Sequence, residues 1–203
     1  MYIVIEGQDG TGKSTQVELL SQYFTKQGKN TITFHEPDGN LKSARALRDI
    51  IKDKTYNLNP MTHVLLFSAT RLELWKKLAE PTLKSGGIVI SARNWWSTLA
   101  YQGYGQGVSR SKIIRLTKSI MPTPYIHPTH SLILTLDDKT RNLRKRTRDH
   151  NSPHDTFESK PTSFQTIVNH AYLKIAKDFN IKTLDASSPI DELFTQVKTQ
   201  LGF

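Results

Sequence analysis

The chain has 203 residues, 36% of them hydrophobic, which is long enough to bury a core without disulfides or structural metals. It contains no cysteine, which excludes disulfides, thiolate catalysis and cysteine-ligated zinc or iron–sulfur sites. The net charge of +10 is compatible with nucleic-acid binding, but equally with a site for several phosphates on a basic surface.

Short apolar runs alternate with longer segments of helical spacing along the whole chain. In chain order, the pattern predicts a strand at 2–6, a helix at 14–27, a strand at 31–34, a helix at 41–51, a long helical stretch at 60–84, a strand at 88–91, helices at 96–102 and 110–120, a proline-rich loop at 121–128, a strand at 131–136, a helix at 139–146, a helix at 163–179, a strand at 182–184 and a helix at 189–201. Repeated strand-then-helix units predict an α/β fold with a five-stranded parallel sheet flanked by helices.

No internal repeat or low-complexity tract divides the sequence, so we expect one domain over residues 1–203. The polar segment 147–160 follows a cluster of arginines and is predicted to be a flap over a site. The opening MYIVIEG lacks the basic lead of a secretory signal and the length of a membrane span. We therefore expect a cytoplasmic protein without a membrane partner.

The first strand and helix enclose a phosphate-binding motif. The run GQDGTGKS, residues 7–14, matches the pattern G-x-x-x-x-G-K-[ST] in the strand–loop–helix context that gives the pattern its meaning. Its glycines let successive N–H groups and the helix N-terminus face a polyphosphate, Lys13 is expected to bridge the β- and γ-phosphates, and Ser14 to ligate Mg²⁺. The predicted ATP-binding residues are Gly7, Gly10, Thr11, Gly12, Lys13, Ser14 and Thr15. The motif alone leaves open whether water, a small molecule or a mechanical partner receives the phosphoryl group.

Later segments decide among these acceptors. With the motif above, the segments HEPDG, LLFSATR, ARNWWSTLAYQG and DTFES and the helix residue Tyr172 follow in an order and spacing that resembles the thymidylate kinases nearly end to end. That family transfers a phosphoryl group from ATP to dTMP. The resemblance implies a P-loop NTPase three-layer sandwich, dTMP and ATP as substrates, Mg²⁺ as cofactor and a homodimer packed through helices.

The resemblance also implies roles for individual residues on the acceptor side. Phe67 is expected to stack on the thymine ring and Arg71 to hydrogen-bond a base carbonyl, and positions four apart on a helix share one face. Asp9 is expected at the deoxyribose 3′-hydroxyl. Glu36, followed by Pro37, is expected to help order either magnesium-bound water or the acceptor pocket.

Further acceptor residues lie on the next segments. Arg48 is the expected ligand of the dTMP phosphate, with Arg45 as the alternative because the spacing is one residue longer than in relatives. The segment after the third strand supplies an arginine for phosphate, a pair of hydroxyl residues, a tyrosine that either limits room near the sugar or packs, and an amide for the polar edge of the base: Arg93, Ser97, Thr98, Tyr101 and Gln102.

One family feature is missing. Ala92 stands where relatives have an aspartate before the arginine, so that side chain cannot hold Mg²⁺ or orient the acceptor. Phosphoryl transfer needs mainly positioning and charge stabilisation, so we expect weaker magnesium affinity or a lower rate rather than no activity. Glu6, Asp9 and Glu36 are candidates to replace the missing carboxylate.

The flap adds positive charge. The P-loop of this chain contains no arginine. In relatives with such a P-loop, an arginine of the flap closes over the ATP phosphates. Arg146 matches that position best and Arg148 is next, so we expect one of them to act with Lys13 and Arg93 on the transferring group. Arg141 and Arg144 are expected on a solvent-exposed helix face.

Two other functions fit the same residues. The acceptor is another pyrimidine deoxynucleotide such as dUMP, because stacking and amide readout do not require the thymine methyl group. Alternatively, the chain is a degenerate relative that binds nucleotide without turnover and serves as a regulatory or nucleic-acid-binding module. The complete P-loop together with Phe67, Arg71 and Gln102 argues for a kinase, so nucleic acid is not the expected partner.

Overall fold

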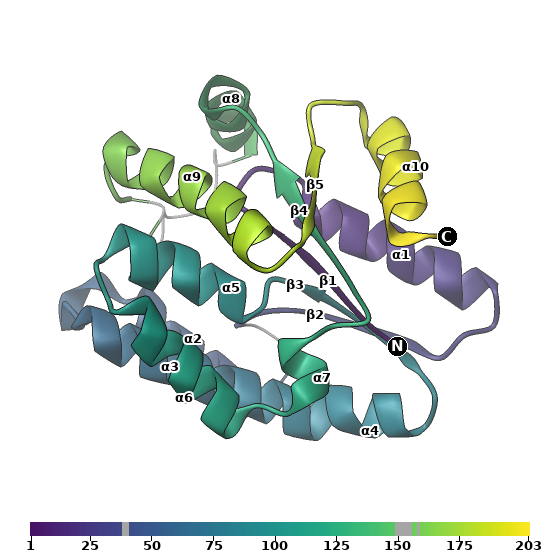
Figure 1. The fold of residues 1–203 in the computed structure, drawn as a ribbon, viewed down its shortest axis with the longest axis horizontal. Helices are drawn as coiled ribbons and strands as arrows, with labels where there is room; N and C mark the ends of the chain where they lie inside the picture. The colour runs from purple at the N-terminus through teal and green to yellow at the C-terminus, as the bar shows by residue number, and fades with distance from the viewer. Residues whose placement is uncertain (38–40, 149–155, 158) are drawn as a thin grey trace.

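The computed structural model describes residues 1–37, 41–157 except 149–155, and 159–203, without the side chains of 145–148. Five parallel strands form one sheet in the order β2-β3-β1-β4-β5 (Figure 1). They are β1 (Tyr2–Gly7), β2 (Thr31–His35), β3 (Ile88–Ala92), β4 (His130–Thr135) and β5 (Lys182–Asp185). The predicted five-stranded parallel sheet is confirmed.

The helices fill the connections between these strands. They are α1 (Lys13–Lys26), α2 (Lys42–Lys52), α3 (Pro60–Leu74), α4 (Glu80–Lys84), α5 (Trp95–Thr98), α6 (Arg110–Ile120), α7 (Thr123–Ile126), α8 (Asp138–Arg148), α9 (Thr162–Asp178) and α10 (Ile190–Leu201). A 3₁₀ turn spans Lys54–Tyr56, and π-helical turns at Trp75–Ala79 and Leu99–Gly105 continue α3 and α5.

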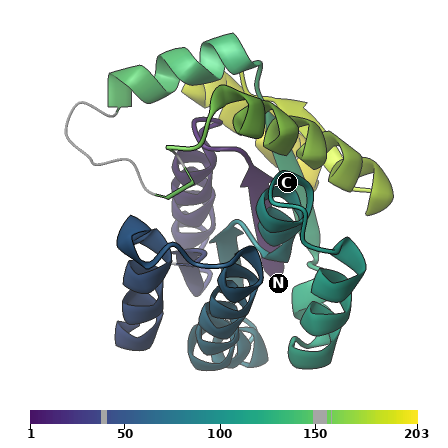
Figure 2. The same ribbon diagram turned by 90° about the vertical axis from the view of Figure 1, so that its left-hand side faces the viewer.

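Two hydrophobic clusters lie on the two faces of the sheet and make it the middle of three layers. On one face, Ile3 and Ile5 of β1 pack with α1 and α10. On the other, Tyr2 and Val4 pack with α2, α3, α5, α6 and α9. The ribbon views show helices on both sides of the sheet (Figures 1 and 2). Because side chains alternate along a strand, this division follows from the sequence of β1 itself. The three-layer α/β sandwich expected from the sequence is therefore confirmed.

Local signals explain several helix boundaries. Gly28, at a φ of 75°, follows α1, and its N–H bonds to the carbonyl of Thr25. At the start of α3, the Asn59 side chain accepts the N–H of Met61 at 2.9 Å, and Pro60 takes the first helical position. The sequence pattern missed α7 because prolines dominate the segment 121–128. Pro124 lies in the first turn of α7, where its missing N–H costs no helical hydrogen bond.

Within the described residues, no helix is both long enough and apolar enough to cross a membrane. The predicted flap at 147–160 falls largely on residues 149–155 and 158, which lie outside the described part of the chain. The assignment of 1–203 to one domain stays a prediction.

Candidate active site

The loop between β1 and α1 turns tightly against the end of β4. Gly7 has a φ of 138°, and a Cβ added to it would lie 2.3 Å from the Leu134 carbonyl oxygen. A larger residue therefore does not fit at this place. The Lys13 ammonium is buried over the loop and donates to the Gln8 carbonyl at 2.8 Å, and the Thr11 hydroxyl donates to the same oxygen at 2.9 Å. The arrangement keeps a cation and the start of α1 beside the loop, which suits a polyphosphate.

Arg93 joins this loop to α5 and α9. It follows β3 at a φ of 75°, a conformation that costs a non-glycine residue free energy and that occurs preferentially at functional sites. Its Nη1 donates to the Gly7 carbonyl (3.2 Å), to Ser97 Oγ (3.0 Å) and to the Tyr172 hydroxyl (3.1 Å), while Nη2 pairs with Asp9. The guanidinium is thus fixed between the P-loop, α5 and α9.

Asp9 is held from two directions. Besides its ion pair with Arg93, it accepts a hydrogen bond from the Tyr101 hydroxyl at 3.0 Å. Burial opposes ionisation of Asp9, but Arg93, Lys13 and Tyr101 outweigh burial and hold its pKa well below the usual range. Burial and the Asp9 charge raise the pKa of Tyr101, so this hydroxyl stays protonated and acts as a donor.

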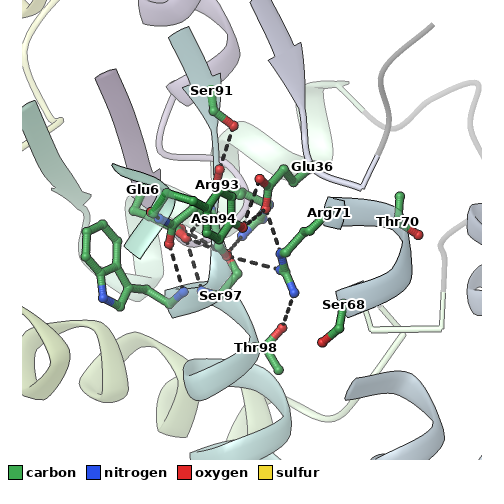
Figure 3. Close-up of polar contacts among 12 residues, drawn as sticks. Glu6, Glu36, Ser68, Thr70, Arg71, Ser91, Arg93, Asn94, Ser97 and Thr98 are labelled. Carbon is green, nitrogen blue, oxygen red and sulfur yellow. Dashed lines mark hydrogen bonds and ion pairs between the residues drawn. The ribbon is translucent and has the colours of Figure 1, made fainter. Parts of the chain in front are cut away.

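Glu6 fixes the start of α5. It lies on the same face of β1 as Tyr2 and Val4, so it meets α5 and α9. Its carboxylate accepts the N–H groups of Asn94 (2.7 Å) and Ser97 (3.1 Å) (Figure 3). It also accepts a hydrogen bond from the Tyr172 hydroxyl at 3.1 Å. A carboxylate at a helix N-terminus satisfies donors that the helix itself leaves unpaired. Glu6 therefore positions the residues that hold Arg93.

A second buried ion pair lies beside it. Arg71 donates from Nε to Glu36 Oε2 at 2.6 Å, from Nη1 to Thr98 Oγ1 at 2.7 Å and from Nη2 to the Asn94 carbonyl at 3.1 Å (Figure 3). The Tyr125 hydroxyl contacts both Glu36 oxygens, at 2.9 and 3.0 Å. Burial raises the pKa of Glu36 to about 7, although Arg71 and Tyr125 favour its charged form.

Aromatic rings border this ion pair. The Arg71 guanidinium lies 5.4 Å from the centre of the Phe67 ring, and Phe67 contacts Phe157 with ring centroids 5.9 Å apart. Phe157 also contacts His63 and Tyr101. Burial, together with nearby Lys160, lowers the pKa of His63, so its ring is neutral near neutral pH.

Several residues of this network were not predicted from the sequence. His63 had a usable signal, because it precedes Phe67 by four positions on one helix and so shares its face. Tyr125 and Gln165 reach the site from distant segments, and their spacing gave no such signal. Phe157 belongs to the segment DTFES, which resembles the family pattern, but no site role was predicted for it.

The remaining predicted residues lie outside the hydrogen-bond networks of Arg93 and Arg71. Gln102 is buried, and its amide donates to Gln106 at 3.3 Å. On α2, Arg48 is partly buried and Arg45 is exposed. Pro37 follows Glu36 through a cis peptide bond, and Thr15 is exposed on α1. A cavity of about 650 Å³ beside α6 and the end of α9 includes none of the predicted site residues.

The predicted flap arginines lie at the C-terminal end of α8. Arg146 and Arg148 belong to this helix, but their side chains are outside the described part of the structure. Arg141, expected on a solvent-exposed face, is instead buried, and its Nη2 lies 3.3 Å from Asp138. Arg144 is the partner of the Ser187 carbonyl at 3.2 Å. The solvent-face expectation is therefore wrong for Arg141, because α8 turns this residue inward.

The place of the missing aspartate lies on the α1 face of the sheet. Ala92 belongs to the cluster of that face and is paired in register with His35 of β2. His35 Nδ1 lies 3.4 Å from Ser14 Oγ. Glu6 in β1 and Glu36 after β2 lie on the opposite face of the sheet from Ala92, by the alternation of side chains along each strand. Their carboxylate oxygens already accept hydrogen bonds within the protein, which argues against either as a replacement for the missing aspartate.

The side chains around the P-loop also indicate how a metal ion could bind. Among the described residues, no group of three or more histidine, aspartate or glutamate side chains is arranged to hold one. Mg²⁺ commonly binds through one or two protein groups together with substrate phosphates rather than in a cage of protein ligands. The exposed Ser14 hydroxyl at the start of α1 fits that mode of binding.

Comparisons with known proteins show which proteins the chain is similar to in sequence and fold. A family model described as thymidylate kinase matches residues 5–197. A thymidylate kinase of Thermosipho africanus (strain TCF52B) is 33% identical, over 98% of this chain and 96% of that protein. One of Prochlorococcus marinus (strain AS9601) is 36% identical, over 98% and 94%. The crystal structure of thymidylate kinase from Ehrlichia chaffeensis superimposes with a TM-score of 0.77 at 27% identity, over 98% of this chain and 97% of that chain.

Proposed function

Because the chain belongs to the thymidylate kinase family, we propose that it phosphorylates dTMP at a site between the P-loop, α3 and α5. It is a dTMP kinase, which converts dTMP to dTDP with ATP as the phosphoryl donor. The observation that carries the site assignment is Arg93, whose one guanidinium contacts Gly7 and Asp9 of the donor loop and Ser97 of the acceptor side.

On the donor side, the P-loop residues Gly7 to Thr15 bind the ATP phosphates. Backbone N–H groups and the N-terminus of α1 supply partial positive charge, and the Lys13 ammonium adds a full positive charge. In the structure the Lys13 ammonium bonds to the Gln8 carbonyl, and it exchanges this partner for phosphate oxygens when ATP binds.

On the acceptor side, Phe67 stacks on the base, while Arg71 and Gln102 read its polar edge. Both Glu36 and Thr98 hold Arg71, so its guanidinium is oriented before substrate arrives. Asp9 and Tyr101 contact the sugar, with Ser97 nearby, and Arg48 binds the dTMP phosphate together with Arg93. Arg48 is partly buried whereas Arg45 is exposed, which supports Arg48 as the phosphate ligand.

The chemistry needs charge stabilisation more than a strong base. A dTMP phosphate oxygen is already ionised near neutral pH, so it attacks the γ-phosphorus without prior loss of a proton. Arg93, Lys13 and a flap arginine, Arg146 or Arg148, stabilise the charge on the transferring group. The fixed position of Arg93 lowers the cost of reorganising this site during the reaction.

Mg²⁺ is the proposed cofactor, and Ser14 would hold it together with the ATP phosphates. When bound, it neutralises charge on the β- and γ-phosphates. The metal-ordering role of Glu36 stays a prediction, and its contacts with Arg71 and Tyr125 support a positioning role. We further propose a single domain, a homodimer packed through helices and a cytoplasmic location, as the family resemblance implies.

The test is ADP release with ATP and Mg²⁺ against dTMP, dUMP, dGMP or no acceptor. We expect turnover with dTMP far above the control without acceptor. Lack of turnover with every nucleotide, despite measurable ATP binding, would contradict the proposal. Light scattering of the purified protein tests the homodimer.

A further inference from the structure

A phenylalanine that precedes α9 packs among the aromatic side chains of the proposed acceptor site. The ring centroid of Phe157 lies 5.1 Å from that of His63 and 5.9 Å from those of Phe67 and Tyr101. Phe157 is 8% exposed. Phe67 and Tyr101 are the residues proposed to contact the base and the sugar, so Phe157 borders both parts of the same site.

Hydrogen bonds connect the backbone of Phe157 to the P-loop. The Gln165 side-chain amide donates to the Phe157 carbonyl at 2.8 Å. The Gln8 amide in turn donates to the Gln165 side-chain oxygen at 2.9 Å and to its carbonyl at 2.8 Å. Both glutamines are buried, so these bonds are shielded from competition with water. The position of Phe157 is therefore tied to the loop that binds ATP.

The other side of the segment is also anchored. The Thr156 hydroxyl donates to the Lys52 carbonyl at the end of α2 at 2.7 Å. Phe157 thus lies between an attachment to α2 and an attachment to α9. A ring held from both sides is pre-organised, and a pre-organised wall discriminates among ligands better than a mobile one.

The neighbours of Phe157 point to a ligand-binding role rather than to core packing alone. His63, Phe67 and Arg71 are spaced by four along α3, so they share the face that meets Phe157. His63 Nδ1 is buried and has no hydrogen-bond partner among the described residues. Such an atom is available to a ligand or to a water, and this one lies beside the residues proposed to contact the base.

We propose that Phe157 is a specificity-determining residue of the acceptor site and that Gln8 and Gln165 position it. The inference rests on the proposed function. The ring limits the space beside Phe67 to a single-ring base and fixes Tyr101 next to the sugar. Purine nucleotides are then disfavoured by sterics, and dTMP gains an apolar contact.

The first experiment measures KM for dTMP and for ATP, and kcat/KM for dTMP and dGMP, in Phe157→Ala and Phe157→Leu. We expect Phe157→Ala to raise the dTMP KM by about 5- to 20-fold with the ATP KM within about 2-fold, and Phe157→Leu to lie between it and the wild type. The preference for dTMP over dGMP falls by a similar factor. Phe194→Ala, a truncation in the cluster on the opposite face, is the matched control and leaves these values unchanged.

The second experiment tests the positioning role with Gln165→Leu, alone and in the Phe157→Ala background. Alone it raises the dTMP KM by about 3-fold, and added to Phe157→Ala it has no further effect, because the ring that it positions is gone. Gln22→Leu, an exposed glutamine on α1, is the control.

The outcomes separate this inference from the function on which it rests. If the wild type turns over dTMP but Phe157→Ala, folded by its melting temperature, keeps the wild-type dTMP KM and selectivity, the inference is wrong and the function stands. Fully additive effects of the two substitutions would refute the positioning role. A wild type without dTMP turnover would overturn both.

Discussion

Replacement of Arg93 is the sharpest test of the proposed chemistry. Its Nη1 makes three hydrogen bonds and its Nη2 one ion pair, and methionine removes all four together with the charge. Loss of one group that stabilises transition-state charge costs about 3–4 kcal/mol, or about 10²–10³-fold in rate. We expect Arg93→Met to lower kcat by at least this factor.

Arg93→Lys separates charge from geometry. The ammonium keeps the charge, but its single nitrogen cannot reach the partners of both Nη1 and Nη2, so at least one charge-assisted hydrogen bond is lost. Such a bond contributes about 1.5–3 kcal/mol, and we expect a loss of about 10- to 100-fold in kcat/KM. ADP release at saturating ATP and varied dTMP measures both parameters.

Folding must be monitored in both variants. The side chains of Arg93 and Asp9 are 16% and 26% exposed, so the loss of their pair is partly offset by water and we expect a stability loss of about 1–3 kcal/mol. Arg115→Met, an exposed arginine on α6, controls for the charge change. A folded Arg93→Met enzyme within about 3-fold of the wild-type kcat would refute the reasoning.

Three further results are expected. Ala92→Asp lowers the Mg²⁺ concentration for half-maximal rate by about 10-fold, because it restores a carboxylate on the α1 face, and an unchanged magnesium titration would contradict that role. Gly7→Ala reduces the free energy of unfolding by about 2–4 kcal/mol, because the added Cβ meets the Leu134 carbonyl. Gly28→Ala reduces it by only about 1 kcal/mol, because a Cβ there meets nothing within 4 Å. Equal losses for the two variants in urea titrations would be inconsistent with the close approach at Gly7. Because burial holds the pKa of Glu36 at about 7 against an ordinary 4.5, its contribution to stability is full below pH 4.5 and is lost as the pH rises through 7. The wild type therefore loses stability relative to Glu36→Gln between pH 5 and pH 8, and parallel pH profiles would show that the shift is absent.

The sequence by itself determined what depends on neighbouring residues. Alternating apolar positions specify strands, the spacing of Ser14 to Gln27 specifies a helix, and the glycines and Lys13 of the P-loop lie within eight consecutive positions. Each signal is local, so no long-range contact was needed to read it. The thymidylate kinase family was readable for the same reason, because its motifs are short and occur in a fixed order.

Only the tertiary structure decided which distant residues meet. The order β2-β3-β1-β4-β5 places the end of β3 beside β1, so Arg93 reaches Asp9 across 84 positions, and Tyr172 reaches Glu6 across 166. Phe157 and Gln165 join the site in the same way. No periodicity encodes these meetings, because they result from the packing of helices on a sheet whose strand order differs from the chain order.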